Sequence, residues 1–137
     1  MDRIMLKSKI HRAILTGADL HYEGSIAIDK TLMAKADLVP GEQVHVLNIN
    51  NGSRFVTYVI EAAAGTKAVV LNGAAARLAA VGDVVIILSY CSLAETELPD
   101  FSPSIVLVDE QNNILERRIN SPVLGNLTSS SDKEETL

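Results

Sequence analysis

The sequence has few aromatic residues, one cysteine and no block of basic residues, and each shortage excludes something. Aromatic residues make up 4% of the 137 residues and tryptophan is absent, so a core must be built from aliphatic side chains. The single cysteine, Cys91, excludes an internal disulfide and a cysteine-based metal cluster. A net charge of −5 without a basic block argues against a nucleic-acid partner. No apolar run has membrane-spanning length and no signal-peptide core is present, so we expect a cytoplasmic protein without a membrane partner.

Alternation of apolar and polar residues predicts a mainly β fold. The length suggests one domain that can bury a core. A turn is predicted at residues 17–19, a hairpin at Asn51-Gly52, a helix over residues 30–37 capped by Asp29, and a second short helix after Asn72. Strands are predicted over residues 5–15, 26–28, 43–49, 54–61, 66–71, 84–90, 105–108 and 114–118.

One predicted strand and the C-terminal part of the chain differ in polarity. Residues 84–90 are almost all apolar, which predicts a strand buried on both faces. From about residue 120 the chain becomes polar. We therefore expect a single domain over residues 1–119 and a disordered tail over residues 120–137.

Two stretches of the chain resemble each other. Residues 36–46 and 77–87 each read as a short helix, a glycine followed by an acidic residue, and a strand. Gly41 corresponds to Gly82. Two such halves would suit a small barrel with pseudo-twofold symmetry.

Period 2 in two strands predicts which side chains share a face. Over residues 5–15 it places Lys9, His11 and Ala13 together, a pattern that by itself is typical of a solvated edge. Over residues 54–61 it places Thr57 and Tyr58 on opposite faces. If both serve one site, the strand must bend or bulge there, or two subunits must share the site.

Residues 20–29, with the sequence LHYEGSIAID, surround the pair Gly24-Ser25. A Gly-Ser pair alone is typical of a turn. This segment, however, resembles the processing site of the aspartate 1-decarboxylase family, whose members depend on a pyruvoyl group. The resemblance extends from about residue 5 to residue 108. Three further blocks carry it at the family's spacing: Met5-Leu6 with Lys9-Ile10-His11-Arg12; Asn51-Gly52 with Arg54-Phe55 and Thr57-Tyr58; and Asn72-Gly73-Ala74-Ala75-Ala76.

The resemblance implies a fold, a self-cleavage, a reaction and an assembly. The fold is a small six-stranded double-psi β-barrel with short helices. The chain cuts itself at Gly24-Ser25 into residues 1–24 and 25–137, and Ser25 becomes a covalent pyruvoyl group, so that neither a metal nor PLP is needed. The implied reaction is decarboxylation of L-aspartate to β-alanine and CO2 for pantothenate and coenzyme A synthesis. The implied assembly is a homotetramer with sites at subunit interfaces, and the need for a maturation protein stays open.

The resemblance also implies roles for individual residues. Ser25 provides the pyruvoyl group that forms a Schiff base with the substrate, Tyr58 is the proton donor, and Asn72 bonds to the developing charge. Self-cleavage involves Gly24, Ser25 and Thr57, with Thr57 stabilising the oxyanion. Substrate binding falls to Lys9, Arg54, Thr57, Gly73, Ala74 and Ala75, and His11 and Tyr22 shape the site.

Other functions remain open from the sequence. A non-catalytic double-psi barrel binding module would need no Ser25, Tyr58 or Asn72, and would stay as one intact chain. A pyruvoyl decarboxylase of another acidic amino acid, such as glutamate, would differ in pocket depth. A serine hydrolase has the least support, because no Gly-x-Ser-x-Gly motif is present.

Overall fold

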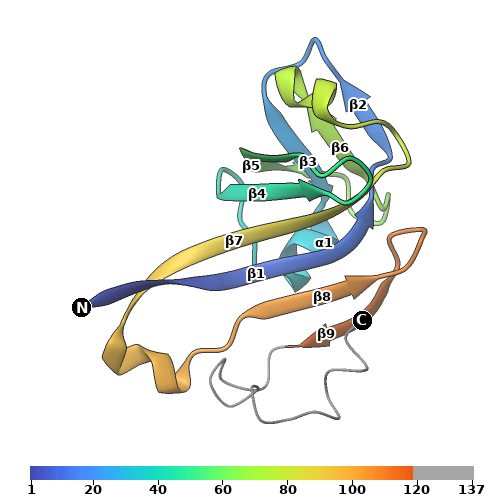
Figure 1. Cartoon of the computed structure of the whole chain (residues 1–137). Coiled ribbons are helices and arrows are strands. Elements are labelled where there is room, and N and C mark those ends of the chain that lie inside the picture. The colour runs from blue at the N-terminus through green and yellow to red at the C-terminus, as the bar shows by residue number, and fades with distance from the viewer. Residues whose placement is uncertain (119–137) are drawn as a thin grey trace.

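The computed structural model describes residues 1–118, and the predicted tail over residues 120–137 lies outside them. These residues form one nine-stranded sheet with the strand order β2-β6-β3-β5-β4-β7-β1-β8-β9 (Figure 1). The mainly β prediction with short helices is confirmed, with more strands than the six expected. The elements are β1 (Asp2–Ile14), β2 (Gly17–Asp19), β3 (Ser25–Asp29), α1 (Lys30–Lys35), β4 (Gln43–Asn48), β5 (Arg54–Ala62), β6 (Val69–Asn72), the 3₁₀ helix η1 (Gly73–Leu78), β7 (Val84–Ala94), the 3₁₀ helix η2 (Glu95–Asp100), β8 (Ser104–Val108) and β9 (Ile114–Arg118).

The two similar stretches of sequence fold alike and make equivalent contacts. Gly41 and Gly82 both have left-handed φ values, 87° and 95°, in the turns that lead into β4 and β7. The Gly41 N–H donates to the Val59 carbonyl at 2.8 Å, and the Gly82 N–H donates to the Leu15 carbonyl at 2.8 Å. The strands that follow, β4 and β7, then pair with each other antiparallel. The predicted internal repeat is therefore present in the structure.

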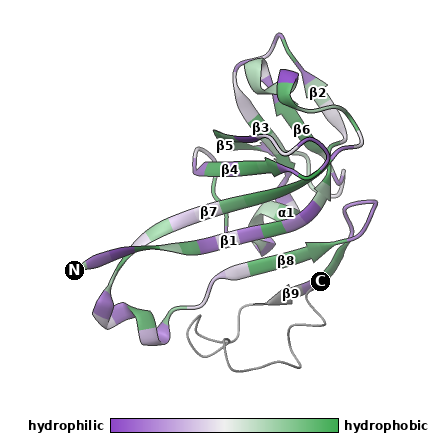
Figure 2. Cartoon of the chain, in the orientation of Figure 1, coloured by the Kyte–Doolittle hydropathy of each residue, from purple (hydrophilic) through white to green (hydrophobic). Residues whose placement is uncertain are grey.

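Aliphatic side chains fill the interior on one face of this sheet. Ile10, Ile87 and Val46 occupy paired positions on β1, β7 and β4, and all three are buried. Leu32 and Met33 add the buried face of α1, which Asp29 caps as predicted. Fully burying each such side chain stabilises the fold by about 1.5–3 kcal/mol. Figure 2 shows this hydrophobic character along β7 and β8.

One expected facing in β1 is wrong because the strand contains a bulge. Arg12 has a left-handed φ of 67°, and the pairing with β7 shifts register between Ile10 and Ala13. A bulge inserts one residue and returns the next side chain to the opposite face. Ala13 therefore joins Ile10 in the core, whereas Lys9 and His11 share the other face as predicted.

Two other expectations also fail. Residues 17–19 were expected to turn but form β2, which pairs parallel with β6. β7 is not buried on both faces, since Tyr90 is exposed and Ile86 only half-buried on the face opposite Ile87. β7 instead runs on to Ala94 beside β1, as a long ribbon that reaches η2 (Figure 1). No helix within the described part of the chain is long and apolar enough to cross a membrane.

Candidate active site

The Ser25 hydroxyl lies at the start of β3 and is buried between two partners. The residue is 1% exposed. Asn72 Nδ2 donates to Ser25 Oγ at 3.0 Å, and the hydroxyl donates to the Glu23 carbonyl at 3.2 Å. The side chain is thus turned back toward the chain that precedes it and away from solvent.

The pairing of β3 with β6 brings Asn72 to Ser25. The antiparallel register joins Ser25 to Asn72 and Ile26 to Leu71. Ile26 and Leu71 are both fully buried, so a slip by one residue would turn core side chains outward. The core therefore fixes the hydroxyl beside the amide, and Asn72 itself is buried.

β5 lies on the other side of β3 and carries Thr57. The parallel pairing of these strands begins at Ile26 and Val59, and two positions earlier stand Gly24 and Thr57. Thr57 is half-buried, on the same face as the buried Val59. Continued two positions beyond the paired residues, this register would bring Thr57 level with Gly24.

Tyr58 faces the opposite way and is 40% exposed, as its alternation with Thr57 predicts. The pairing of β5 with β4 is regular from Arg54 to Tyr58, so the strand has no bulge there. Within residues 1–118 no hydrogen bond joins Thr57 or Tyr58 to Ser25. A single chain thus does not aim both side chains at one point.

The predicted cationic residues lie with Tyr58 on the outer face of the sheet. Lys9 on β1 and His45 on β4 both pair with Leu88 on β7. His45 also pairs with Val56, which lies midway between Arg54 and Tyr58 on β5. Arg54 begins β5, four residues before Tyr58, which is roughly 13 Å along an extended strand. β5, β4 and β7 lie between β1, which carries Lys9, and β3, which carries Ser25, so the single chain keeps Lys9 apart from Ser25.

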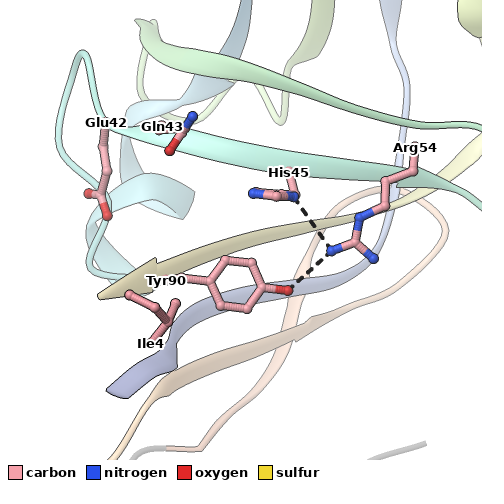
Figure 3. Close-up of a pocket in the computed structure, with 6 residues that line it drawn as sticks. All are labelled: Ile4, Glu42, Gln43, His45, Arg54 and Tyr90. Atoms are coloured by element: carbon pink, nitrogen blue, oxygen red, sulfur yellow. Dashed lines mark hydrogen bonds between the residues drawn. The ribbon is translucent and has the colours of Figure 1, made fainter. Parts of the chain in front are cut away.

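A pocket of about 460 Å³ surrounds the Arg54 guanidinium on this outer face (Figure 3). Arg54 Nη2 donates to the Tyr90 hydroxyl at 3.3 Å and lies 3.5 Å from His45 Nδ1. The His45 and Tyr90 rings meet edge to face with centroids 5.1 Å apart. The pocket is lined by Ile4, Glu42, Gln43, His45, Arg54 and Tyr90.

The contacts of His45 and Tyr90 with Arg54 were missed from the sequence. The alternation of residues 43–49 puts Val44 and Val46 inside and so signals that His45 faces out. No comparable signal exists for Tyr90. Residues 84–90 are almost all apolar, so their sequence shows no alternation that distinguishes the inward face from the outward face.

His11 shares a face of β1 with Lys9, and the pKa of its imidazole is lowered. Its Nδ1 is buried and has no hydrogen-bond partner among the described residues. Burial lowers the pKa of His11, and the positive charges of Lys9 and Arg12 lower it further. The imidazole is therefore biased toward its neutral form, which suits a residue that shapes a site for an anion without adding charge.

The remaining predicted residues differ in their burial and surroundings. Gly73 is buried and opens η1 directly after Asn72, whereas Ala74 is exposed and Ala75 packs against the core. Tyr22 is exposed, with its ring in the segment before the proposed cut. No cluster of three metal-ligating side chains occurs in the described residues.

The chain is similar to known proteins over most of its length. A family model described as aspartate decarboxylase matches residues 1–115. The chain is 55% identical to aspartate 1-decarboxylase of Thermoanaerobacter pseudethanolicus over 112 residues, which is 82% of this chain and 96% of that protein. It is 57% identical to aspartate 1-decarboxylase 2 of Gloeobacter violaceus over 84% of this chain and 92% of that protein. Among solved structures it is similar to the rationally designed mkDPBB_sym_86 protein, with a TM-score of 0.43 and 24% identity over 56% of this chain and 90% of that chain.

Proposed function

This chain belongs to the aspartate decarboxylase family, and from that membership we propose that it cuts itself between Gly24 and Ser25 and then converts L-aspartate to β-alanine and CO2, a step toward pantothenate. One observation carries the proposal. The Ser25 hydroxyl is buried, accepts from Asn72 and donates back toward the preceding chain. A serine of an ordinary turn is mostly exposed to solvent and needs no buried amide partner.

Self-cleavage is an attack of Ser25 Oγ on the carbonyl carbon of Gly24. The oxygen–carbon bond forms, the peptide C–N bond breaks, and the Ser25 nitrogen takes up the hydroxyl proton, which leaves an ester. Loss of the Ser25 Cα proton then expels residues 1–24 as a carboxylate and leaves dehydroalanine. Water then hydrolyses the dehydroalanine at residue 25, so that its nitrogen leaves as ammonia and a pyruvoyl group remains. Burial of Ser25 favours this route, because bulk water is kept from the ester.

We assign the stabilisation of the negative charge on the Gly24 oxygen to Thr57. In related reactions, one hydrogen-bond donor to such an oxyanion lowers the barrier by about 3 kcal/mol. The register supports the assignment, because its continuation by two positions would bring Thr57, on the strand next to β3, level with Gly24. Its side chain also lies on the half-buried face, where a hydrogen bond meets little competition from water.

The surroundings of Ser25 fit the pyruvoyl group that the family implies. Asn72 Nδ2 donates at 3.0 Å to Ser25 Oγ, which leaves with residues 1–24, so after the cut this donor is available to a group bound at residue 25. We assign Gly73, Ala74 and Ala75, which directly follow Asn72 in η1, to substrate binding. When formed, a pyruvoyl group supplies an electron sink for the loss of CO2 from an amino acid.

We assign the substrate carboxylates to Arg54 and Lys9, and the proton returned to the substrate to Tyr58. Arg54 can hold a carboxylate through two parallel hydrogen bonds, and Lys9 adds a point charge. Because β5, β4 and β7 lie between Lys9 on β1 and Ser25 on β3, we propose a homotetramer in which the outer face of one copy meets the Ser25 region of its neighbour. Val56, 51% exposed, and Tyr90, 37% exposed, are apolar surface that such a contact would cover.

The test uses purified protein alone, so that cleavage without any helper protein is measured directly. We expect two pieces after denaturation, and β-alanine from L-aspartate in excess over any product from L-glutamate. Ser25→Ala should give one intact, inactive chain. If the wild-type chain is cut only after cell extract is added, a maturation protein is required. Decarboxylation of aspartate by Ser25→Ala protein would overturn the proposal.

A further inference from the structure

Gly73 touches the chain on the far side of the proposed cut. Its φ is +76°, and a Cβ built on it would lie 2.6 Å from Gly24 Cα and 2.8 Å from Gly24 N. It would also lie 3.1 Å from the Tyr22 carbonyl oxygen. Side-chain carbons do not approach backbone atoms this closely, so residue 73 has no room for a side chain unless residues 22–24 move.

Other glycines of the described chain lack this contact. Gly41, Gly52, Gly65 and Gly82 also have positive φ, yet a Cβ on any of them would meet nothing within 4 Å. Gly24 has no positive φ, and its own Cβ position is equally open. The tight steric requirement at the cut therefore comes from Gly73, which directly follows β6, and not from Gly24.

We propose that Gly73 is a positioning residue for self-cleavage, which deepens the function proposed above and rests on it. Asn72 holds the attacking oxygen of Ser25, and the next residue fixes the acyl side by letting residues 22–24 lie against its bare backbone. Ser25 itself is anchored by its pairing in β3, so displacement of residues 22–24 changes the approach of Oγ to the Gly24 carbonyl. A misplacement of about 1 Å between reacting groups can slow a reaction by about 100-fold.

The experiment compares Gly73→Ala with Gly52→Ala. Gly52 has nearly the same φ, +77°, so alanine meets the same backbone strain there without the collision. Gly73→Asn and Gly52→Asn form a second pair, because asparagine tolerates a left-handed φ better than alanine and still carries a Cβ. The rate at which newly made precursor is cut is followed by denaturing mass spectrometry, with circular dichroism and melting of the same samples.

We expect both Gly73 variants to fold and to be cut at least about 100-fold more slowly than wild type, and both Gly52 variants to be cut within about threefold of it. Hydroxylamine, which cleaves esters, should not cut the Gly73 variants, because the attack that forms the ester is the step impaired. A purely structural role would not select that step.

Three results would overturn the proposal. The first is a folded Gly73 variant cut at the wild-type rate. The second is an ester that hydroxylamine traps in a Gly73 variant, which would place the defect after the attack. The third is loss of fold in both Gly73 variants while both Gly52 variants fold, which would give Gly73 a role in folding. If wild-type protein stays whole even after cell extract is added, the self-cleavage proposal fails instead.

Discussion

Replacement of Asp29 by alanine should destabilise the strand on which Ser25 lies. Asp29 ends β3, the strand that Ser25 begins, and is 3% exposed. One carboxylate oxygen accepts from the Thr31 N–H at 2.7 Å and so caps α1. The other accepts from the Lys67 N–H at 2.8 Å and ties down the turn before β6. The substitution removes both bonds at once.

The size of the effect follows from these two losses. Loss of a helix cap costs about 1 kcal/mol, and leaving the Lys67 N–H without its partner costs about 1–3 kcal/mol. The sum of about 2–4 kcal/mol should lower Tm by roughly 6–15 °C for a domain of this size. Glu110→Ala is the control, because Glu110 is exposed in a turn and should shift stability by less than about 0.5 kcal/mol.

The effect of Asp29→Ala should also depend on pH. Burial raises the pKa of Asp29, but hydrogen bonds from the N–H groups of Lys67 and Thr31 outweigh it and hold the pKa below its usual 3.8. A carboxyl with a depressed pKa stabilises the fold above its unfolded pKa, and this contribution is lost as pH falls through the folded pKa. The gap in Tm between wild type and variant should therefore be full above about pH 5 and shrink below about pH 4.

The assay is thermal melting followed by circular dichroism at a series of pH values. Asp29→Asn keeps one acceptor for the cap but lacks a titrating carboxyl, so its Tm should not follow this pH dependence. A variant with alanine at residue 29 that melts within about 2 °C of wild type at neutral pH would refute the reasoning. So would a gap that grows as the pH is lowered.

Three further predictions concern catalysis. Tyr58→Phe should leave self-cleavage intact and reduce kcat by at least about 100-fold, because the exposed hydroxyl is assigned to the substrate and not to the cut; wild-type turnover would remove Tyr58 as proton donor. Arg54→Lys should raise KM for aspartate by about tenfold or more and leave cleavage unchanged, because a bidentate contact becomes a point charge; an unchanged KM would show that Arg54 does not hold the substrate. Tyr90→Phe, which removes one hydrogen bond to Arg54, should raise KM by a smaller factor.

The sequence was sufficient for the features that depend on local chemistry. The alternation in β5 correctly placed Thr57 and Tyr58 on opposite faces, and the Asp29 cap of α1 was read from residue type alone. The equivalent turns at Gly41 and Gly82 could be paired from their similar surroundings. Each of these depends on neighbours within a few residues along the chain.

Features that depend on contacts between distant segments could not be predicted. Nothing in the local sequence requires Arg12 to take a left-handed φ, which comes from a bulge against β7. The separation of Arg54 from Ser25 depends on strand order and register. The contact of Gly73 with Gly24 joins the first residue of η1 to the residue before β3, so a sequence motif can mark both glycines but cannot show that they touch.

The mass of freshly purified, active protein after denaturation tests the central claim most directly. We predict two pieces, residues 1–24 and residues 25–137, with the larger lighter by one ammonia than simple hydrolysis would leave it. A single unbroken chain that decarboxylates aspartate and carries an unmodified serine at residue 25 would contradict the account.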